Sequence, residues 1–176
     1  IHFDNSGMNF EVVLNGKSEQ MFVPLLGEHN VLNALFGIAI ADNLGLTPDE
    51  IRNGLKKVVL PRGRLTLDNL EGNRILIDDS YNANPESMIS GLKVLTKYIN
   101  SDKKIALLGD MVEMGSYTRI GHEKVGNSLI NFDLDKVFLF GENSKWILKK
   151  AVEVGFPIDN LHHFDDIDDL ILEMDA

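Results

Sequence analysis

Six polar residues gather in the short segment Asp78–Pro85, directly after an apolar stretch that is predicted to be a strand. Adjacent carboxylates such as Asp78 and Asp79 can hold ribose hydroxyls or a metal ion. Asn84 before Pro85 is suited to cap a following helix. Open α/β sheets bind their ligands at the carboxyl ends of parallel strands, which is where we expect this segment. Because an ordinary turn needs fewer polar residues, we interpret the segment as part of a binding site.

Two further polar clusters precede this segment. Asn30 and Asn33 are three residues apart at the start of a predicted helix, so their amides share one face. An amide both donates and accepts, which suits the edge of adenine. The alternative is a helix cap at Asn30, which the residues alone favour, and an ordinary polar position at Asn33. Arg64 beside Gly63 suits a phosphate oxygen, although a solvated arginine is the better interpretation when this cluster is taken alone.

The first third of the chain is predicted to form a hairpin followed by two helices. Asn15-Gly16 favours a type I′ turn between two strands. The strands and the first helix are expected at Phe10–Leu14, Met21–Leu25 and Asn30–Leu44. A second helix begins at Thr47, with Glu50 completing a capping box. The segment Pro61–Arg64 interrupts the helical spacing and marks a candidate domain boundary.

After this boundary, strand-like segments alternate with helix-like ones. Strands are expected at Arg74–Ile77, Lys104–Leu108, Lys136–Phe140 and Leu161–Phe164. Helices are expected around Met88–Ile99, His122–Ile130 and Trp146–Val152 and at the end of the chain, with Trp146 in the core. Because the strands are apolar at nearly every position, the sheet should be mostly parallel with helices on both faces. The predicted fold class is therefore α/β and Rossmann-like, preceded by an α+β part.

The composition excludes several classes of function. The 176-residue chain is 44% hydrophobic and 25% charged, which is typical of a folded protein with one or two domains. Its formal net charge of −10 disfavours binding to nucleic acid or to an anionic membrane. The lack of cysteine excludes disulfides, thiolate nucleophiles and Cys-ligated zinc. No apolar run reaches membrane-spanning length, which favours a cytoplasmic protein.

Two further expectations concern metal binding and the ends of the chain. His2, His162 and His163 have no carboxylate or second histidine at metal-ligand spacing beyond what a turn explains, and we predict no metal site in this chain. The chain opens at Ile1 without an initiator Met and closes at Ala176 in a helical pattern without a cap. We therefore expect it to be a piece of a longer protein.

Together, the polar clusters resemble the ordered signature of the Mur ligase family. The motifs are Gly27-x-His29-Asn30-x-x-Asn33, Gly63-Arg64 and Asp78–Pro85. The last motif, with Gly109–Gly115 and His122 after it, is most similar to family members that add D-alanyl-D-alanine to UDP-N-acetylmuramoyl-tripeptide. The resemblance extends from Phe10 to the end of the chain, and the Asn-Ala-Asn-Pro run is far more specific than a lone glycine-rich loop.

The resemblance implies a domain arrangement and a reaction. Residues 1–64 would be the C-terminal part of a central ATP-binding domain, and residues 65–176 a Rossmann-like C-terminal ligase domain that is truncated at its end. The intact enzyme would use ATP and Mg²⁺ to phosphorylate a carboxylate. The amine of the dipeptide would then attack the acyl phosphate, so the implied partners are ATP, D-alanyl-D-alanine and UDP-N-acetylmuramoyl-tripeptide.

The resemblance also implies roles for individual residues. Asn30 and Asn33 would contact the adenine region of ATP. Arg64 would reach the ribose or phosphates from the hinge between domains, and Asp79 would hold the ribose. The other polar residues of the third motif would line the same cleft: Tyr81, Asn82 and Asn84. The dipeptide would bind to the C-terminal domain.

The sequence also departs from the family pattern. It has no Gly-x-x-x-x-Gly-Lys-[Ser/Thr] phosphate loop, no counterpart of the carbamylated lysine or of the upstream magnesium ligands, and no Lys-Gly-Ser-Arg stretch near its end. We therefore expect no complete catalytic set here and no activity from this chain alone. Two alternatives stay open: a non-catalytic nucleotide- or peptide-binding module on a Rossmann-like scaffold, and a ligase similar to folylpolyglutamate synthase.

Overall fold

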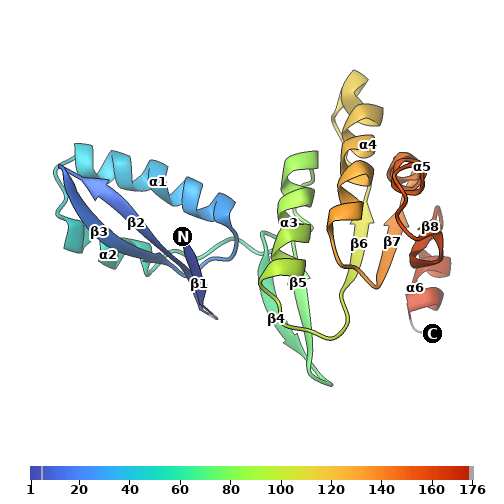
Figure 1. Ribbon diagram of the computed structural model, residues 1–176, viewed down its shortest axis with the longest axis horizontal. Coiled ribbons are helices and arrows are strands. Elements are labelled where there is room, and N and C mark those ends of the chain that lie inside the picture. The colour runs from blue at the N-terminus through green and yellow to red at the C-terminus, as the bar shows by residue number, and fades with distance from the viewer. Residues whose placement is uncertain (5, 175–176) are drawn as a thin grey trace. The chain divides into compact units, whose positions relative to one another are not determined.

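The computed structural model describes residues 1–4 and 6–174 of the chain. The molecule consists of two compact units, Ile1–Asp79 and Ser80–Ala176. Figure 1 labels the helices and strands of both units, which are described one at a time below.

An antiparallel sheet opens the first unit. Its strands are β1 (His2–Asp4), β2 (Gly7–Leu14) and β3 (Lys17–Val23), in the order β1-β2-β3. Asn15 and Gly16 connect β2 to β3 with φ angles of 50° and 76°. Positive φ at both central residues defines the type I′ turn, so the predicted hairpin is confirmed.

Two helices pack with this sheet. The helix α1 (Glu28–Asn43) begins two residues before the predicted start, and its N-cap is Gly27. Asn30 therefore lies in the first turn, and its prediction as the cap is wrong. The helix α2 (Pro48–Leu55) has the predicted capping box, because the Thr47 side chain accepts a hydrogen bond from the Glu50 N–H and Glu50 bonds back to the Thr47 N–H.

One face of α1 carries an exposed apolar stripe. The stripe consists of Leu32, Phe36, Ile40 and the C-cap residue Leu44, with exposed fractions of 59%, 73%, 63% and 72%. Residues four apart lie on the same helix face, so the four side chains form one line. The helix buries Val31 and Ile38 instead.

A second hairpin completes the first unit. The strands β4 (Thr66–Leu70) and β5 (Arg74–Asp78) pair antiparallel as a separate two-stranded sheet. The prediction that Asp78 ends a parallel strand is therefore wrong, because a short apolar run looks the same in either type of sheet. The division between units follows this hairpin, whereas the predicted domain boundary at Arg64 precedes it, and that boundary stays a prediction.

The second unit is built on a parallel sheet, which confirms the predicted α/β class. Its strands are β6 (Ile105–Gly109), β7 (Lys136–Phe140) and β8 (Leu161–Phe164), in the order β6-β7-β8. The flanking α-helices are α3 (Pro85–Lys97), α4 (Thr118–Ser128), α5 (Lys145–Glu153) and α6 (Ile167–Met174). Short 3-10 helices lie at Gly115–Tyr117, Leu129–Asn131, Glu142–Ser144 and Ile158–Asn160. Figure 1 shows α4 and α5 beside the strands that they connect.

The core of this unit lies between the sheet and its helices. Val137 and Leu139 of β7 are fully buried, as are Val125 of α4 and Ile147 of α5. Each buried aliphatic side chain contributes about 1.5–3 kcal/mol. The central strand and the two connecting helices therefore fix the positions of the loops at the sheet edge.

Trp146 does not belong to this core, so its predicted place is wrong. The side chain is half-buried, and the Arg119 guanidinium carbon lies 4.4 Å from its ring centroid. Its neighbour Ile147 occupies the inward position of α5 instead. A large aromatic ring with a polar N–H is well suited to such a boundary between core and solvent.

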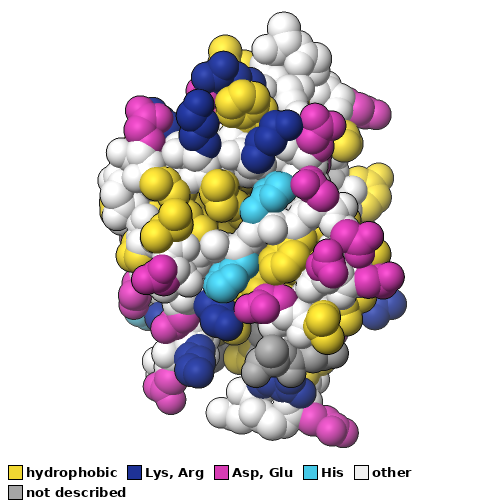
Figure 2. All heavy atoms as spheres, turned by 90° about the vertical axis from the view of Figure 1, so that its right-hand side faces the viewer, with side chains coloured by type: hydrophobic (Ala, Val, Ile, Leu, Met, Phe, Trp, Pro, Cys, Tyr) yellow, Lys and Arg dark blue, Asp and Glu magenta, His cyan; other side chains and the backbone are white. Residues whose placement is uncertain are grey.

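The outer surface of the second unit is rich in carboxylates. Figure 2 views the side of the molecule on which α5, β8 and α6 lie, and acidic side chains there adjoin hydrophobic and histidine side chains. Among the described residues, no helix combines the length and apolar character that a membrane span requires.

Candidate functional site

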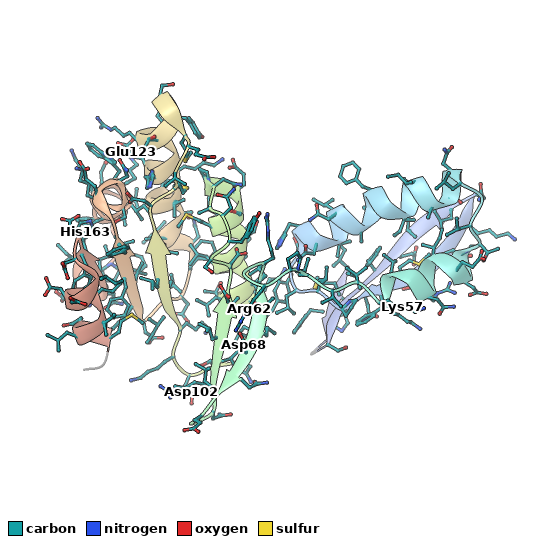
Figure 3. The ribbon with its side chains drawn as sticks, turned by 180° about the vertical axis from the view of Figure 1, so that it is seen from behind. Lys57, Arg62, Asp68, Asp102, Glu123 and His163 are labelled. Atoms are coloured by element: carbon teal, nitrogen blue, oxygen red, sulfur yellow. The ribbon has the colours of Figure 1, made fainter. Side chains whose placement is uncertain are left out.

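The open end of the β4–β5 hairpin brings two of the predicted site residues together. The register pairs Thr66 with Asp78, which places the residues just outside that pair, Leu65 and Asp79, opposite each other. The Asp79 Oδ1 atom accepts a hydrogen bond of 3.1 Å from the Leu65 N–H. Arg64 directly precedes Leu65, and its positive charge favours the ionised form of the Asp79 carboxylate. Figure 3 shows that Arg62, two residues earlier, also lies at this hairpin.

Burial dominates the electrostatics of Asp79. Burial raises the pKa of this carboxyl above its ordinary value, and the neighbouring Asp78 charge acts in the same direction. The Leu65 hydrogen bond and the Arg64 charge lower the pKa, but they compensate only in part. A ligand that donates hydrogen bonds to Asp79, such as a ribose hydroxyl, would stabilise its ionised form.

Asn30 and Asn33 are in contact, as their spacing indicates. Asn33 Nδ2 lies 3.4 Å from Asn30 Oδ1 and donates to it. Asn30 is buried, and its Nδ2 donates to the Leu26 carbonyl at 2.8 Å, so this amide ties the start of α1 to the preceding segment. Asn33 is exposed. Burial also lowers the pKa of the nearby His29.

The third motif folds into the start of α3. Asn84 Oδ1 accepts a hydrogen bond of 2.9 Å from the Ser87 N–H, and Ser87 Oγ accepts one of 3.0 Å from the Asn84 N–H. This reciprocal cap confirms the predicted helix start. Asn82 Oδ1 accepts a bond from the Ala83 N–H at 2.9 Å. Tyr81 is exposed at the same turn.

Asp110, directly after β6, is a residue to which sequence reasoning gave no role. Its Oδ2 accepts hydrogen bonds of 3.1 and 3.0 Å from the backbone N–H and the side-chain amide of Asn143. Its Oδ1 accepts a bond of 2.7 Å from the Ser144 N–H. The carboxylate thus joins the loops after two neighbouring strands. The sequence did contain a signal for Asp110: it is an acidic residue that directly follows a predicted parallel strand, and such a residue lies at the ligand-binding edge of the sheet.

His122 holds the loop after β6 from the other side. Its ring is fully buried, and Nε2 accepts a hydrogen bond of 3.0 Å from the Met111 N–H. Nδ1 lies 2.7 Å from the Thr118 carbonyl oxygen, which can only accept, so Nδ1 carries the proton. Both ring nitrogens therefore form hydrogen bonds with backbone groups, and this arrangement requires the neutral ring.

The loop after β6 and the third motif meet at α4. A Cβ atom at Gly121 would lie 2.4 Å from Met114 Cε and 3.0 Å from Pro85 Cγ, so both segments contact α4 at this glycine. Lys124 on α4 also forms an ion pair with Glu86 on α3. The hydrogen bond from Lys124 lowers the pKa of Glu86 and raises that of Lys124. Across residues 1–4 and 6–174, no cluster of three or more His, Asp or Glu side chains is arranged to hold a metal ion.

Comparison with known proteins identifies the family of this chain. The family model described as "Mur ligase, glutamate ligase domain" matches residues 63–175. The chain belongs to the Mur ligase family. Arg64, Asp79 and the loop around Asp110 all lie within the matched residues, whereas Asn30 and Asn33 lie before them.

Two curated relatives of this Mur ligase chain carry the same name. A UDP-N-acetylmuramoyl-tripeptide–D-alanyl-D-alanine ligase from Bacillus subtilis is 30% identical over 90% of this chain and 34% of the relative. The ligase of the same name from Escherichia coli is 34% identical over 82% of this chain and 31% of the relative. The chain thus spans about a third of the length of these relatives.

Solved structures of Mur ligases share this fold. A crystal structure of MurF from Acinetobacter baumannii superposes with a TM-score of 0.84 and 28% identity, over 96% of this chain and 35% of that one. MurF from Thermotoga maritima, solved in complex with ADP, has a TM-score of 0.76 at 22% identity, over 98% of this chain and 38% of that one. The nucleotide-binding roles predicted for residues of this Mur ligase chain stay predictions: Asn30, Asn33, Arg64, Asp79, Tyr81, Asn82 and Asn84.

Proposed function

We propose that this chain acts as the C-terminal part of an ATP-dependent ligase that adds D-alanyl-D-alanine to UDP-N-acetylmuramoyl-tripeptide. The observation that carries the proposal is the likeness to ligases of that name, which extends over 90% of this chain in the Bacillus subtilis relative. The reaction proceeds through phosphorylation of the tripeptide carboxylate, followed by attack of the dipeptide amine. A cytoplasmic location follows from this proposal, because ATP is the co-substrate.

The open end of the β4–β5 hairpin is our proposed contact with the nucleotide. Arg64 provides a guanidinium for phosphate or ribose oxygens, and Asp79 provides a carboxylate for ribose hydroxyls. Support comes from their proximity and from the raised pKa of Asp79, which a hydrogen-bond donor would counteract. Asn33 is the better placed of the two α1 amides for a ligand, because Asn30 is buried and bonded to Leu26.

ATP supplies the phosphoryl group that activates the carboxylate, and Mg²⁺ offsets the charge of the phosphates. Mg²⁺ prefers carboxylate and phosphate oxygens. Since the described residues provide no cluster of three carboxylates or histidines, we propose that its protein ligands lie in other parts of the ligase. The chain itself would bind nucleotide and dipeptide and position them.

The test is a ligation assay with the purified full-length ligase and with the 176-residue chain. The full-length protein is expected to join D-alanyl-D-alanine to UDP-N-acetylmuramoyl-tripeptide and to release ADP and phosphate. The chain alone is expected to form no product. Product from glutamate and a folate would instead favour the folylpolyglutamate-type ligase, and dose-dependent ligation by the chain alone would contradict the division of labour proposed here.

A further inference from the structure

The loop between β6 and α4 is held at two separate points. Its first residue, Asp110, receives three hydrogen bonds from Asn143 and Ser144 in the loop after β7. The N–H of its second residue, Met111, donates to the buried His122 ring. A loop that is fixed on both sides in this way has few alternative conformations. The Asp110 carboxylate and the buried His122 imidazole therefore both fix the conformation of this loop.

Gly141 leaves room for the Asp110 carboxylate. A Cβ atom at position 141 would lie 2.6 Å from Asp110 Cγ and 2.8 Å from its Oδ1. The residue also has a φ of 103°, which side chains rarely permit. Both properties require glycine at this position. The contact between the two loops is therefore tight and leaves no space for a side chain at position 141.

The same network extends to the third strand. The Gly141 N–H donates to the Phe164 carbonyl at 3.0 Å, and the Gly141 carbonyl accepts a bond of 3.0 Å from His163 Nε2. Figure 3 labels His163, which lies on β8. Because these residues lie at or directly after the carboxyl ends of β6, β7 and β8, one network joins the ends of all three parallel strands. This is the edge at which open α/β sheets bind their ligands.

We infer that Asp110 and His122 are positioning residues that hold the loop Met111–Gly115 in the conformation that receives the dipeptide substrate. Glu113 in this loop has a φ of 60°, a left-handed conformation that a non-glycine residue keeps only when its surroundings enforce it. Met114 and Pro85 both lie against Gly121 of α4, so the loop adjoins the start of α3. This inference rests on the proposed function, because it assigns the loop to one substrate of that reaction.

The first arm of the test measures the network itself in the 176-residue chain. Amide hydrogen exchange is followed in Asp110→Ala, in the milder Asp110→Asn and in the control Asp133→Ala, whose side chain is 99% exposed. We expect exchange at Asn143 and Ser144 to accelerate about tenfold or more in Asp110→Ala, because hydrogen bonds to a charged group are lost. The control is expected to match the wild type. Unchanged protection in both Asp110 variants would overturn the inference.

The second arm measures kinetics in the full-length ligase. Asp110→Ala is expected to raise the KM for D-alanyl-D-alanine about tenfold while the KM for ATP stays within about twofold. His122→Gln is expected to retain much of the wild-type KM, because a glutamine oxygen can replace Nε2 as the acceptor for Met111. His122→Phe, which has no acceptor, is expected to resemble Asp110→Ala.

The outcomes separate the two proposals. An unchanged dipeptide KM in folded Asp110→Ala and Asp110→Asn enzymes would overturn the substrate role of the loop while leaving the ligase function intact. An equal rise in the KM for ATP and for the dipeptide would also overturn it, because the network would then be a general support. A wild-type enzyme that ligates no D-alanyl-D-alanine would instead overturn the proposed function, and the substrate role of the loop with it.

Discussion

Asp79 combines a structural role with the ligand-binding role that we propose for it. Its carboxylate closes the open end of the β4–β5 hairpin by accepting the Leu65 N–H. Burial nevertheless makes the charged form less favourable than it is in water. Arg64 supplies part of the compensation. A residue held in this balance is well placed to gain from a ligand, because a bound hydroxyl donor adds compensation that the protein alone does not supply.

Arg64→Ala and Asp79→Ala are expected to slow turnover of the full-length ligase strongly. In the proposed site each residue forms a charged hydrogen bond to the nucleotide, and losing such a bond costs on the order of 2–4 kcal/mol, or tens to several hundredfold in rate. Steady-state kinetics with varied ATP would measure the loss. Arg62→Ala is the matched control, because Arg62 is exposed two residues away. If both site variants keep the wild-type rate, these residues have only surface roles.

Asp79→Asn is expected to change stability in a pH-dependent way. Because the pKa of Asp79 is raised in the folded state, its ionisation opposes folding, and the stability from its protonated form is lost as pH rises through the folded pKa. Asparagine keeps an acceptor for the Leu65 N–H without the charge. The variant should therefore be at least as stable as the wild type at pH 7, and this advantage should vanish below the ordinary aspartate pKa of 3.8. Denaturant unfolding at pH 7 and below pH 3.8 would measure the difference in stability. A variant less stable than the wild type at pH 7 would contradict the prediction.

At the scale of residues, the sequence predicted local structure in part, and the ligand-binding roles of the site residues stay predictions. The nucleotide-binding roles of Arg64 and Asp79 followed from family resemblance, and nothing in their spacing reveals the hairpin that brings Leu65 against Asp79. Asn30 was expected to cap a helix, but Gly27 occupies that position and Asn30 bonds inward. Asp110 received no role because its partners lie more than thirty residues away in sequence.

Elements with local signals were predicted well. The turn at Asn15-Gly16 and the cap at Thr47 depend on nearest neighbours, and both are confirmed. The strand β4 was missed because Asp68 and Asn69 interrupt its apolar pattern. Because β4 was not predicted, β5 was interpreted as a parallel strand. Pairing between strands is a long-range property that a short apolar run does not encode.

Removal of the cap of α3 is expected to lower stability whether or not Asn84 also contacts a ligand. Asn84→Ala leaves the Ser87 N–H without its side-chain acceptor and should cost about 1 kcal/mol. Asn82→Ala is the matched control, because Asn82 bonds only to the adjacent Ala83 N–H among the described contacts. Chemical denaturation of both variants would compare them. Equal stability in the two would mean that the cap contributes little and that Asn84 serves mainly another purpose.

For the molecule as a whole, charge and apolar surface act against each other. The formal net charge is −10, so two copies of the chain repel each other in dilute buffer. The apolar stripe of Leu32, Phe36, Ile40 and Leu44 favours contact between copies. Salt weakens the repulsion, because the screening length falls from about 30 Å at 0.01 M to about 3 Å at 1 M ionic strength. It does not weaken the apolar attraction.

The stripe on α1 should therefore make the colloidal behaviour of the purified chain dependent on salt. We expect light scattering to report single copies at low ionic strength and growing assemblies as sodium chloride is added, with a dye such as ANS binding in parallel. Phe36→Asp places a charge at the most exposed position of the stripe, at 73%, and should suppress both signals with little change in Tm. Asp102→Asn, an exposed change outside α1, makes the net charge less negative without touching the stripe and should shift the onset to lower salt. If both substitutions leave the scattering unchanged, another surface governs the association.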